Sequence, residues 1–493
     1  MKQWHFTVLL TGMIFWNVKV GWTQQDLTTQ PEWIQNIDIG TINKIHLHTT
    51  SSQQTEVYVY GLLVGPEPGF FVRKYDSSGG EIWTHKHIEE TADQFRFDKA
   101  IDFEVDSDGN AYVLWRNSLP NDKAAWILIN FGHEGKLLKR TSYVTGVDDK
   151  PADLAINKKG EVFVAGTVRG KPRKGRIRPD QLFPNNDILV LKFTKGLKTA
   201  WKQPFQFDSR YLLHDQAIGL DVDHQGNVYI AGDQEKSTQY VDTEDTWNGI
   251  VLKIDSKGKL IWERTYFSGI KSETSGTEER HPIHDIKVNP EKGDVVVTGV
   301  SNAVSILTHR YNMDGALIWS DFFLAGFNPS IRATLALEIV NKELASVYVA
   351  GKSQPPGGSY YGPYDDFATI KYKGQGELSE GKVIAKKEWQ AFYKYPSSDP
   401  SRIRFSSQPS SLALDAQGNV YVTGFSRSGY NVFYPVVTYD QNGSQRGEPL
   451  VQPGEPITFL HSEYKFPPLM EVDLDGNIYL AANKTLLKYS AIR

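Results

Sequence analysis

The sequence predicts an all-β chain built from one repeated unit of four antiparallel strands. The clearest copy begins with Leu220–Gly232, where two short apolar runs flank a polar turn. Alternation of Val, Ile and Tyr is typical of strands with one buried face. Two further apolar runs, 250–255 and 260–266, follow around a turn at Gly258, and the second of them carries a tryptophan. No α-helical period interrupts this pattern.

The unit recurs eight times, which is the second observation. Copies of the second strand are Val57–Gly61, Ala111–Trp115, Val162–Gly166, Val228–Gly232, Val295–Gly299, Val347–Gly351, Val420–Gly424 and Ile478–Ala482. The end of the third strand, counted independently, recurs in the same order at 74–75, 130–131, 192–193, 253–254, 310–311, 371–372, 438–439 and 488–489. A four-stranded unit repeated about every 50 to 60 residues is typical of a β-propeller. We therefore predict a single propeller of eight blades, with seven blades as the alternative.

The two ends of the chain predict how the ring closes. The predicted blades cover 41–90, 98–146, 151–207, 215–268, 283–324, 331–395, 408–452 and 467–490. The last blade holds only three strands, whereas the segment 32–37 has no partner and carries Trp33. The fourth strands carry tryptophan too, at Trp83, Trp201, Trp262, Trp319 and Trp389. We predict that 32–37 completes the last blade, because an unpaired sheet edge is a liability that closure removes.

One motif suggests a family. Asp-x-x-Gly-Asn-x-Tyr-x-x-Gly stands at Asp223–Gly232 and Asp415–Gly424, and a Lys-x-Asp turn and a tryptophan strand follow the first of these. This pattern resembles the bacterial SBBP-type β-propeller repeat over nearly the whole chain after the N-terminus. The resemblance is weakest at 41–60 and 331–351, where the Gly-Asn turn is missing. It implies an exported bacterial propeller and implies no reaction, because propellers host many functions.

The N-terminus predicts export. Lys2 precedes an apolar segment, Phe6–Trp16, that is too short to span a bilayer comfortably. We expect a signal peptide over 1–23 and a mature chain over 24–493, in the periplasm, on the cell surface or outside the cell. A retained membrane anchor is the alternative. No later stretch is apolar enough to cross a membrane.

Composition excludes several classes of function. The chain has 493 residues, a net charge of −4 and no cysteine, so it has neither disulfides nor thiolate metal sites. A charge this near zero gives no reason to expect a nucleic-acid partner. We expect a monomer.

Two turns contain part of a calcium loop. Asp106–Asn110 and Asp473–Asn477 read Asp-x-Asp-Gly-Asn, but the twelfth positions, where an EF-hand has an acid, are Asn117 and Lys484. We favour ordinary strand turns, which leaves Ca²⁺ as the one cofactor hypothesis. The pairs His46/His48 and His85/His87 each share one strand face and permit a metal, without a nearby acid to support it.

The starts of the innermost strands give the catalytic candidates. Aligning the blades there brings together Asp102, Asp153, His214-Asp215, His284-Asp285, Arg332 and Ser411. The best candidates for acid–base work are His214, Asp215, His284 and Asp285. The alternative, which we favour, is that these aspartates accept hydrogen bonds from backbone amides between blades.

Long insertions between the second and third strands give the binding candidates. Strand alternation places all of these loops on one face, and such loops commonly build binding surfaces. The loop 169–178 is basic and offers Arg173, Lys174 and Arg176, whereas 352–366 offers Tyr360, Tyr361 and Tyr364, with Trp247 nearby in a neighbouring loop. We predict a non-enzymatic binding or scaffold protein for a glycan or a protein partner. The alternative is an enzyme acting on extracellular polysaccharide.

Overall fold

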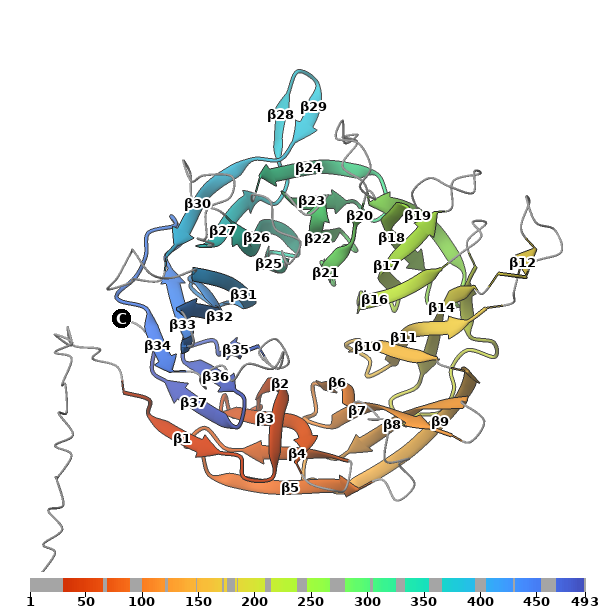
Figure 1. Ribbon diagram of the computed structural model, residues 1–493, viewed down its shortest axis with the longest axis horizontal. Coiled ribbons are helices and arrows are strands. Elements are labelled where there is room, and N and C mark those ends of the chain that lie inside the picture. Colours follow the sequence, from red (N-terminus) through yellow and green to blue (C-terminus); the bar gives the residue numbers. More distant parts are fainter. Residues whose placement is uncertain are drawn as a thin grey trace, which may run out of the picture.

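The chain forms a ring of eight four-stranded antiparallel blades around a central axis (Figure 1). The computed structural model describes residues 30–64, 69–88, 100–119, 123–147, 149–170, 173–174, 182–183, 185–208, 214–236, 246–266, 280–301, 305–324, 333–353, 366–394, 405–428, 431–453 and 467–491. These residues form strands, turns and bends but no helix. The predicted all-β propeller with eight blades is therefore confirmed. The described part also contains no helix with the length and apolarity of a membrane span.

The first four blades follow one another along the chain. Blade one is β2 (Gly40–Thr49), β3 (Thr55–Leu63), β4 (Gly69–Tyr75) and β5 (Glu81–Ile88). Blade two is β6 (Ala100–Val105), β7 (Ala111–Ser118), β8 (Lys123–Phe131) and β9 (Leu137–Val147). Blade three is β10 (Lys150–Ile156), β11 (Val162–Arg169), β14 (Asn186–Phe193) and β15 (Phe205–Phe207), with a small ribbon of β12 (Arg173–Lys174) and β13 (Leu182–Phe183). Blade four is β16 (Asp215–Val222), β17 (Val228–Lys236), β18 (Thr246–Ile254) and β19 (Leu260–Tyr266), and β20 (Arg280–His281) pairs with β18.

The remaining blades complete the ring. Blade five is β21 (Ile283–Val288), β22 (Val295–Ser301), β23 (Ser305–Tyr311) and β24 (Leu317–Leu324). Blade six is β25 (Ala333–Val340), β26 (Glu343–Ser353), β27 (Asp366–Lys373) and β30 (Lys387–Tyr393), with a projecting hairpin of β28 (Glu377–Ser379) and β29 (Lys382–Ile384). Blade seven is β31 (Phe405–Leu414), β32 (Val420–Ser428), β33 (Asn431–Tyr439) and β34 (Leu450–Pro453). Blade eight is β35 (Leu469–Val472), β36 (Ile478–Ala482), β37 (Thr485–Tyr489) and β1 (Trp33–Asn36).

Ring closure joins the two ends of the chain, as predicted. β1 pairs antiparallel with β37, so that Trp33 lies opposite Lys488. The backbone amide of Glu32 donates to the carbonyl of Lys488 at 2.7 Å, and the Glu32 carboxylate accepts from its ammonium group at 2.7 Å. The fourth strand of the last blade therefore comes from the start of the described chain.

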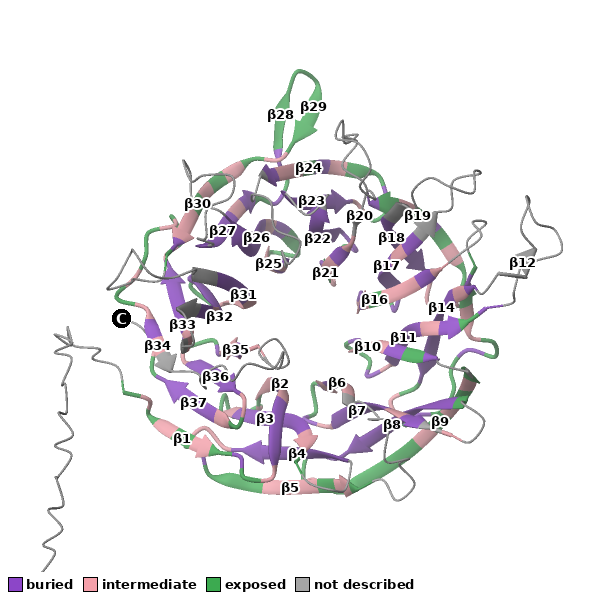
Figure 2. Cartoon of the chain, viewed as in Figure 1, coloured by how far each residue is buried: buried purple, intermediate pink, exposed green. Residues whose placement is uncertain are grey.

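The core lies between neighbouring blades rather than inside any one of them. The middle strands are buried on both faces, whereas the outermost strands expose alternate residues (Figure 2). On β3, Tyr58 and Tyr60 pack against blade two, whereas Val57 and Val59 pack against blade eight. Each middle strand therefore contributes to two cores, which explains why both of its faces are apolar.

The repeated Asp-x-x-Gly-Asn-x-Tyr motif is a self-contained turn. In blade four, Asp223 Oδ1 accepts the backbone amides of Gln225 and Asn227. Its Oδ2 accepts the Asn227 side-chain amide at 2.7 Å and the Tyr229 hydroxyl at 3.1 Å. Gly226 has a φ of +85°, a conformation that other residues rarely adopt. Asp106 and Asp473 belong to the two turns that resemble part of a calcium loop. Their carboxylates accept hydrogen bonds from the equivalent donors of their own turns.

A tryptophan seam joins neighbouring blades. Trp262 Nε1 of blade four donates to the carbonyl oxygen of Met313 in blade five at 3.1 Å, and Lys253 Nζ donates to the same oxygen at 2.8 Å. The indole lies on Gly315 of that turn. The same indole hydrogen bond is made by Trp33, Trp83, Trp201, Trp319 and Trp389. The repeated tryptophans are therefore packing anchors between blades.

Strand alternation gives the ring two different faces. The turns between first and second strands and between third and fourth strands lie on one face, which we call the turn face. The connections between second and third strands and between successive blades lie on the other, which we call the loop face. The blade repeat itself thus separates the turns that hold the ring together from the segments that are free to vary.

Candidate functional site

The central channel is lined by the first strand of every blade, and strand register defines its positions. Most second strands contain a glycine, as at Gly61 and Gly232. In each blade, the first-strand residue that pairs with the position just before this glycine, or before the residue that replaces it, belongs to what we call the first ring. These residues are Lys44, Asp102, Asp153, Gly219, Asp285, Thr334, Ser411 and Leu469. The second ring lies two residues further on: His46, Glu104, Ala155, Asp221, Lys287, Ala336, Ala413 and Glu471. Because first strands begin at the loop face, the first ring lies nearer that face.

A bulge precedes the first ring in six blades. One extra residue interrupts the register at Asn43, Ile101, Ala152, Ile218, His284 and Ser410. Bulges bend a strand and redirect the side chains around them. Four of these extra residues, from blades two to five, line a cavity at the channel.

Carboxylates of the two rings connect each blade to the next. Asp153 Oδ2 accepts the backbone amide of Leu220 in blade four at 2.8 Å. Asp285 Oδ2 accepts the amide of Leu335 in blade six at 2.9 Å. Asp102, Asp221 and Glu471 accept the amides of Leu154, Val288 and Leu47 in the same way. Hydrogen bonding between blades therefore accounts for one oxygen of each carboxylate.

Asp102 and Asp153 form a close acidic pair. The amide of Leu154 lies 3.0 Å from Asp102 Oδ2 and 2.9 Å from Asp153 Oδ1, and the two carboxyl groups hydrogen-bond to each other. Burial raises the pKa of Asp153 well above its ordinary value, and the charge of Asp102 adds to this. Burial also acts to raise the pKa of Asp102, but Lys44 outweighs it, so this pKa is lowered. Asp102 is therefore the more acidic member of the pair, and Asp153 keeps its proton to higher pH.

Two lysines supply the positive charge of the rings. Lys44 Nζ lies 2.7 Å from Asp102 and 2.8 Å from Glu104. Burial opposes its charge, yet these carboxylates and Asp153 raise the Lys44 pKa well above its ordinary value. Asp285 raises the pKa of Lys287 against the effect of burial. Burial raises the pKa of Asp221 and of Glu471, although Lys287 acts against this at Asp221 and His46 does so at Glu471.

The channel-mouth cavity has a volume of about 200 Å³. Its polar lining includes Asp102, Asp153, Asp285, His284 and Lys287. Its apolar lining includes Ile101, Ala152, Ile218 and Ile286. The cavity is therefore a mixed site with acidic groups beside aliphatic ones.

The structure brings together only half of the catalytic candidates. His284 and Asp285 line the channel-mouth cavity. His284 Nδ1 accepts the amide of Ala333 at 3.1 Å, and Asp285 also accepts the Thr334 hydroxyl at 3.0 Å. Both residues therefore contact blade six through the groups that catalysis would use.

The other two candidates lie elsewhere on the first strand of blade four. His214 bridges to Asn186 of blade three, and burial lowers its pKa. Asp215 lies opposite Gln234 and is only 1% exposed. Neither lines the cavity. Aligning the blades by the starts of their first strands placed Asp215 in the ring of channel residues. The strand register gives the first-ring position of blade four to Gly219 instead, because β16 begins four residues before that position.

The binding candidates belong to the loop face by their place in the chain. Arg173 and Lys174 form β12. Trp247 belongs to β18 and lies opposite Glu235 of β17. The side chains of Arg173, Lys174 and Trp247 lie outside the described part of the structure. Arg176, Tyr360, Tyr361 and Tyr364, together with Arg332 of the channel alignment, lie outside the described residues altogether.

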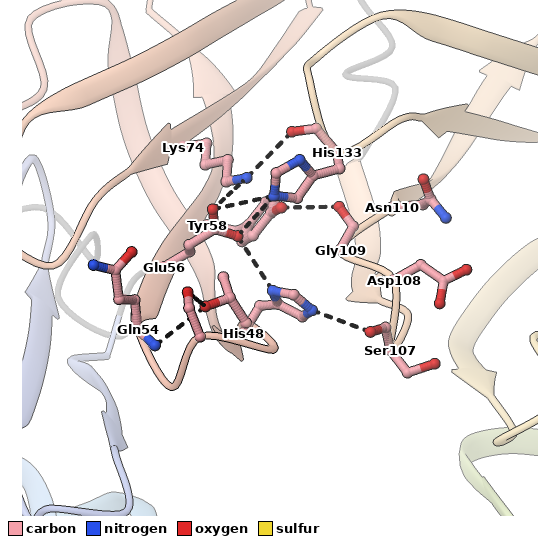
Figure 3. A network of polar contacts seen from close by, with 12 residues as sticks. His48, Gln54, Glu56, Tyr58, Lys74, Ser107, Asp108, Gly109, Asn110 and His133 are labelled. Atoms are coloured by element: carbon pink, nitrogen blue, oxygen red, sulfur yellow. Dashed lines mark hydrogen bonds and ion pairs between the residues drawn. The ribbon is translucent and has the colours of Figure 1, made fainter.

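The structure shows a polar network at the turn face that the sequence analysis did not predict (Figure 3). The Glu56 carboxylate lies 2.8 Å from Lys74 Nζ, 3.1 Å from His133 Nε2 and 3.2 Å from His48 Nδ1. Burial acts to raise the Glu56 pKa, but these groups outweigh it and lower the value. Glu56 and His133 come from neighbouring blades and are 77 residues apart, so no local motif joins them.

The predicted histidine pairs do not form metal sites in the described part of the chain. His46 faces Glu104 and Glu471 at 3.7 and 3.9 Å, whereas His48 belongs to the Glu56 network. The His85 ring packs on an aromatic residue of blade two. No group of three His, Asp or Glu residues is placed to hold a metal among the residues described.

Comparison with known proteins identifies no family for this chain. No family model and no curated protein sequence matches this chain. A similar solved structure is the WD40 domain of SCAP from fission yeast, with 11% identity and a TM-score of 0.47, covering 94% of this chain and 98% of that one. Another is an apocarotenoid oxygenase mutant from Synechocystis, with 10% identity and a TM-score of 0.37, covering 69% and 72%. The similarity to SBBP-type repeats therefore stays a prediction.

Proposed function

We propose that this protein is an exported binding scaffold of the SBBP type that docks a protein partner on its loop face. The observation that carries the proposal is the difference between the two faces of the ring. The turn face is occupied by short turns whose polar groups bond to one another and by the tryptophan seam. The turn residues that make these hydrogen bonds are needed by the fold, which leaves only their exposed neighbours free to evolve a binding surface.

The loop face has the opposite character. It carries every connection between second and third strands and every connection between blades. The basic residues Arg173, Lys174 and Arg176 and the tyrosines 360, 361 and 364 belong to these connections. Tyrosine supplies contact area at a low cost in side-chain entropy, and lysine and arginine attract acidic surfaces.

Two observations support a protein partner rather than catalysis or a sugar. His284 and Asp285 use their polar atoms to contact blade six, and His214 and Asp215 do not join them in one cavity. The channel-mouth cavity, at about 200 Å³, is smaller than the several hundred Å³ typical of small-molecule sites. Among the described residues, this cavity therefore suits one side chain of a protein partner better than a whole small molecule.

Capture with matched variants tests the proposal. The mature chain, 24–493, is immobilised and exposed to a labelled envelope extract and to a panel of soluble polysaccharides. Triple replacement of Tyr360, Tyr361 and Tyr364 by alanine should abolish capture of a defined protein. Replacement of Met313 and Leu474, which are exposed on the turn face, should leave it intact. Loss of capture by the turn-face variant alone, or capture of a polysaccharide instead, would overturn the proposal.

A further inference from the structure

The channel-mouth cavity combines features that suit an organic cation. The carboxyl groups of Asp102, Asp153 and Asp285 lie in its lining, beside the aliphatic side chains of Ile101 and Ile218. Ile218 is 36% exposed although it is a large apolar residue. An alkyl chain that ends in a positive charge would cover the aliphatic part and face the carboxyl groups at the same time.

The two rings hold more acid than base. Six carboxyl groups (Asp102, Glu104, Asp153, Asp221, Asp285 and Glu471) face Lys44, Lys287 and His46. Because the pKa of Asp153 is raised, its carboxyl group is counted as neutral here, and five carboxylates then face three basic groups, so acid remains in excess. Lys287 also lies in the cavity lining, but an excess of one sign of charge between low-dielectric walls attracts ions of the other sign.

The acidic charge is more than the fold requires. Ser411 occupies the first ring in blade seven and contacts the next blade through its hydroxyl, which donates to the carbonyl oxygen of Met470 at 3.0 Å. A neutral side chain is therefore able to connect two blades at this position. The carboxyl groups of Asp102 and Asp153 add charge that the connection itself does not need, and burying charge is unfavourable.

Size and ligand geometry decide the kind of cation. No trio of His, Asp or Glu within the described ranges is placed to hold a metal ion. The cavity is also smaller than the range of drug-sized ligand sites, and its volume of about 200 Å³ suits a single side chain. We propose that the channel-mouth cavity receives the cationic end of an arginine or lysine side chain from the protein that docks on the loop face. The identity of the donor rests on the proposed function, whereas the chemistry of the cavity does not.

Binding would displace a proton from Asp153. The groups that face this carboxyl are Asp102 on β6, Lys44 on β2 and Asp285 and Lys287 on β21. Burial and Asp102 keep Asp153 protonated without a ligand. An arriving cation favours the ionised form, so the proton leaves the Asp153 carboxyl for the solvent as the ion pair forms.

Calorimetry with a small probe tests the cavity without any partner. N-butylguanidinium is titrated into the mature protein at pH 7 in two buffers of different ionisation enthalpy, beside n-butylammonium and neutral n-butylurea. We expect the cations to bind at least tenfold more tightly than the urea, with a proton release that the urea does not cause. Asp153→Asn should abolish proton release and the rise of affinity with pH. The matched control is Asp221→Asn, because Asp221 also accepts the next blade's amide but does not line the cavity, and it should bind within threefold of wild type.

The outcomes separate this inference from the proposed function. Equal affinity for butylguanidinium and butylurea, equal effects of the two Asn variants, or preferred binding of Ca²⁺ would each overturn it. A captured partner whose binding is unchanged by Asp153→Asn would overturn it and leave the loop-face proposal standing. If the cavity binds the probe but no protein partner of the loop face is found, the proposal of a docked side chain is overturned. The cavity would then be a site for a free alkyl amine.

Discussion

Replacing Gly315 by alanine tests how strongly the tryptophan seam holds two blades together. Gly315 has a φ of +78°, and an added Cβ would lie 2.7 Å from Trp262 Cδ2 and 2.9 Å from Cγ. The indole is only 6% exposed and donates to the Met313 carbonyl. Because the ring cannot move without weakening that hydrogen bond, the new methyl group must displace either the turn or the seam.

The expected cost has two parts. An alanine in the left-handed region costs roughly 1–2 kcal/mol relative to glycine. Forcing one extra carbon into a packed contact costs about 1–3 kcal/mol more. We therefore expect Gly315→Ala to lower the free energy of unfolding by roughly 2–5 kcal/mol. Gly381 has the same φ of +78° and no atom within 4 Å of an added Cβ, so Gly381→Ala should lose only the first part.

Urea unfolding, followed by circular dichroism, measures both variants. The comparison is valid where the two variants and wild type share one m-value, since the slope then reports the same exposed surface. The difference between the two alanine variants gives the contribution of the indole contact alone. If both variants lose the same free energy, the backbone conformation explains the whole effect and the seam argument is refuted.

Three further predictions follow from the ring and the N-terminus. Removing residues 24–38 should lower the melting temperature and produce oligomers in size-exclusion chromatography, because β37 loses its partner β1; an unchanged melt would contradict ring closure. Because burial raises the pKa of Asp221 in the folded protein, its contribution to stability is present below the ordinary Asp pKa and is lost as pH rises through the raised value. Urea midpoints measured upward from about pH 4, near the ordinary Asp pKa, should therefore fall less in Asp221→Asn than in wild type, and equal slopes would contradict this. Mass spectrometry of the exported protein should find a first residue near Gln24, whereas an intact N-terminus inside the cell would contradict export.

The sequence predicted the repeated parts of the fold because their determinants are local. The Asp223 turn, the Gly226 conformation and the Trp262 anchor each repeat at fixed spacing, and each acts within one hairpin or one seam. Ring closure was also predictable, since segment 32–37 carries a fourth-strand tryptophan and the last blade lacks that strand. Local chemistry that recurs in most of the eight blades leaves few alternative arrangements.

The channel was harder to predict because register is set across strands. Aligning the blades by the starts of their first strands placed Asp215 in the ring, although Gly219 occupies it. Counting back from the turn gives the right answer, since Asp102, Asp153 and Gly219 each stand eight residues before the last turn residue at 110, 161 and 227. The strand pairs at the turn end stay in register, whereas bulges and connections of unequal length lie before it.

The polar network around Glu56 had no sequence signal. Glu56 meets His133 only because the ring places the turns of blades one and two side by side. Aligning the blades did bring Asp102 and Asp153 together in one ring, but it gave no indication of their shared amide donor, Leu154. Such pairs depend on the blade-to-blade spacing, which no single repeat encodes.

The acidic channel mouth suggests that stability has been exchanged for a binding property. Asparagine at position 153 would keep an acceptor for the Leu220 amide and would carry no charge to bury beside Asp102. Asp153→Asn should therefore be at least as stable as wild type at pH values above the raised pKa of Asp153, where the carboxyl group has lost its proton, while it loses the cation response. A variant that gains stability and loses binding identifies a residue retained for function. A variant that loses stability over the same pH range would instead show that the carboxyl group is needed by the blades themselves.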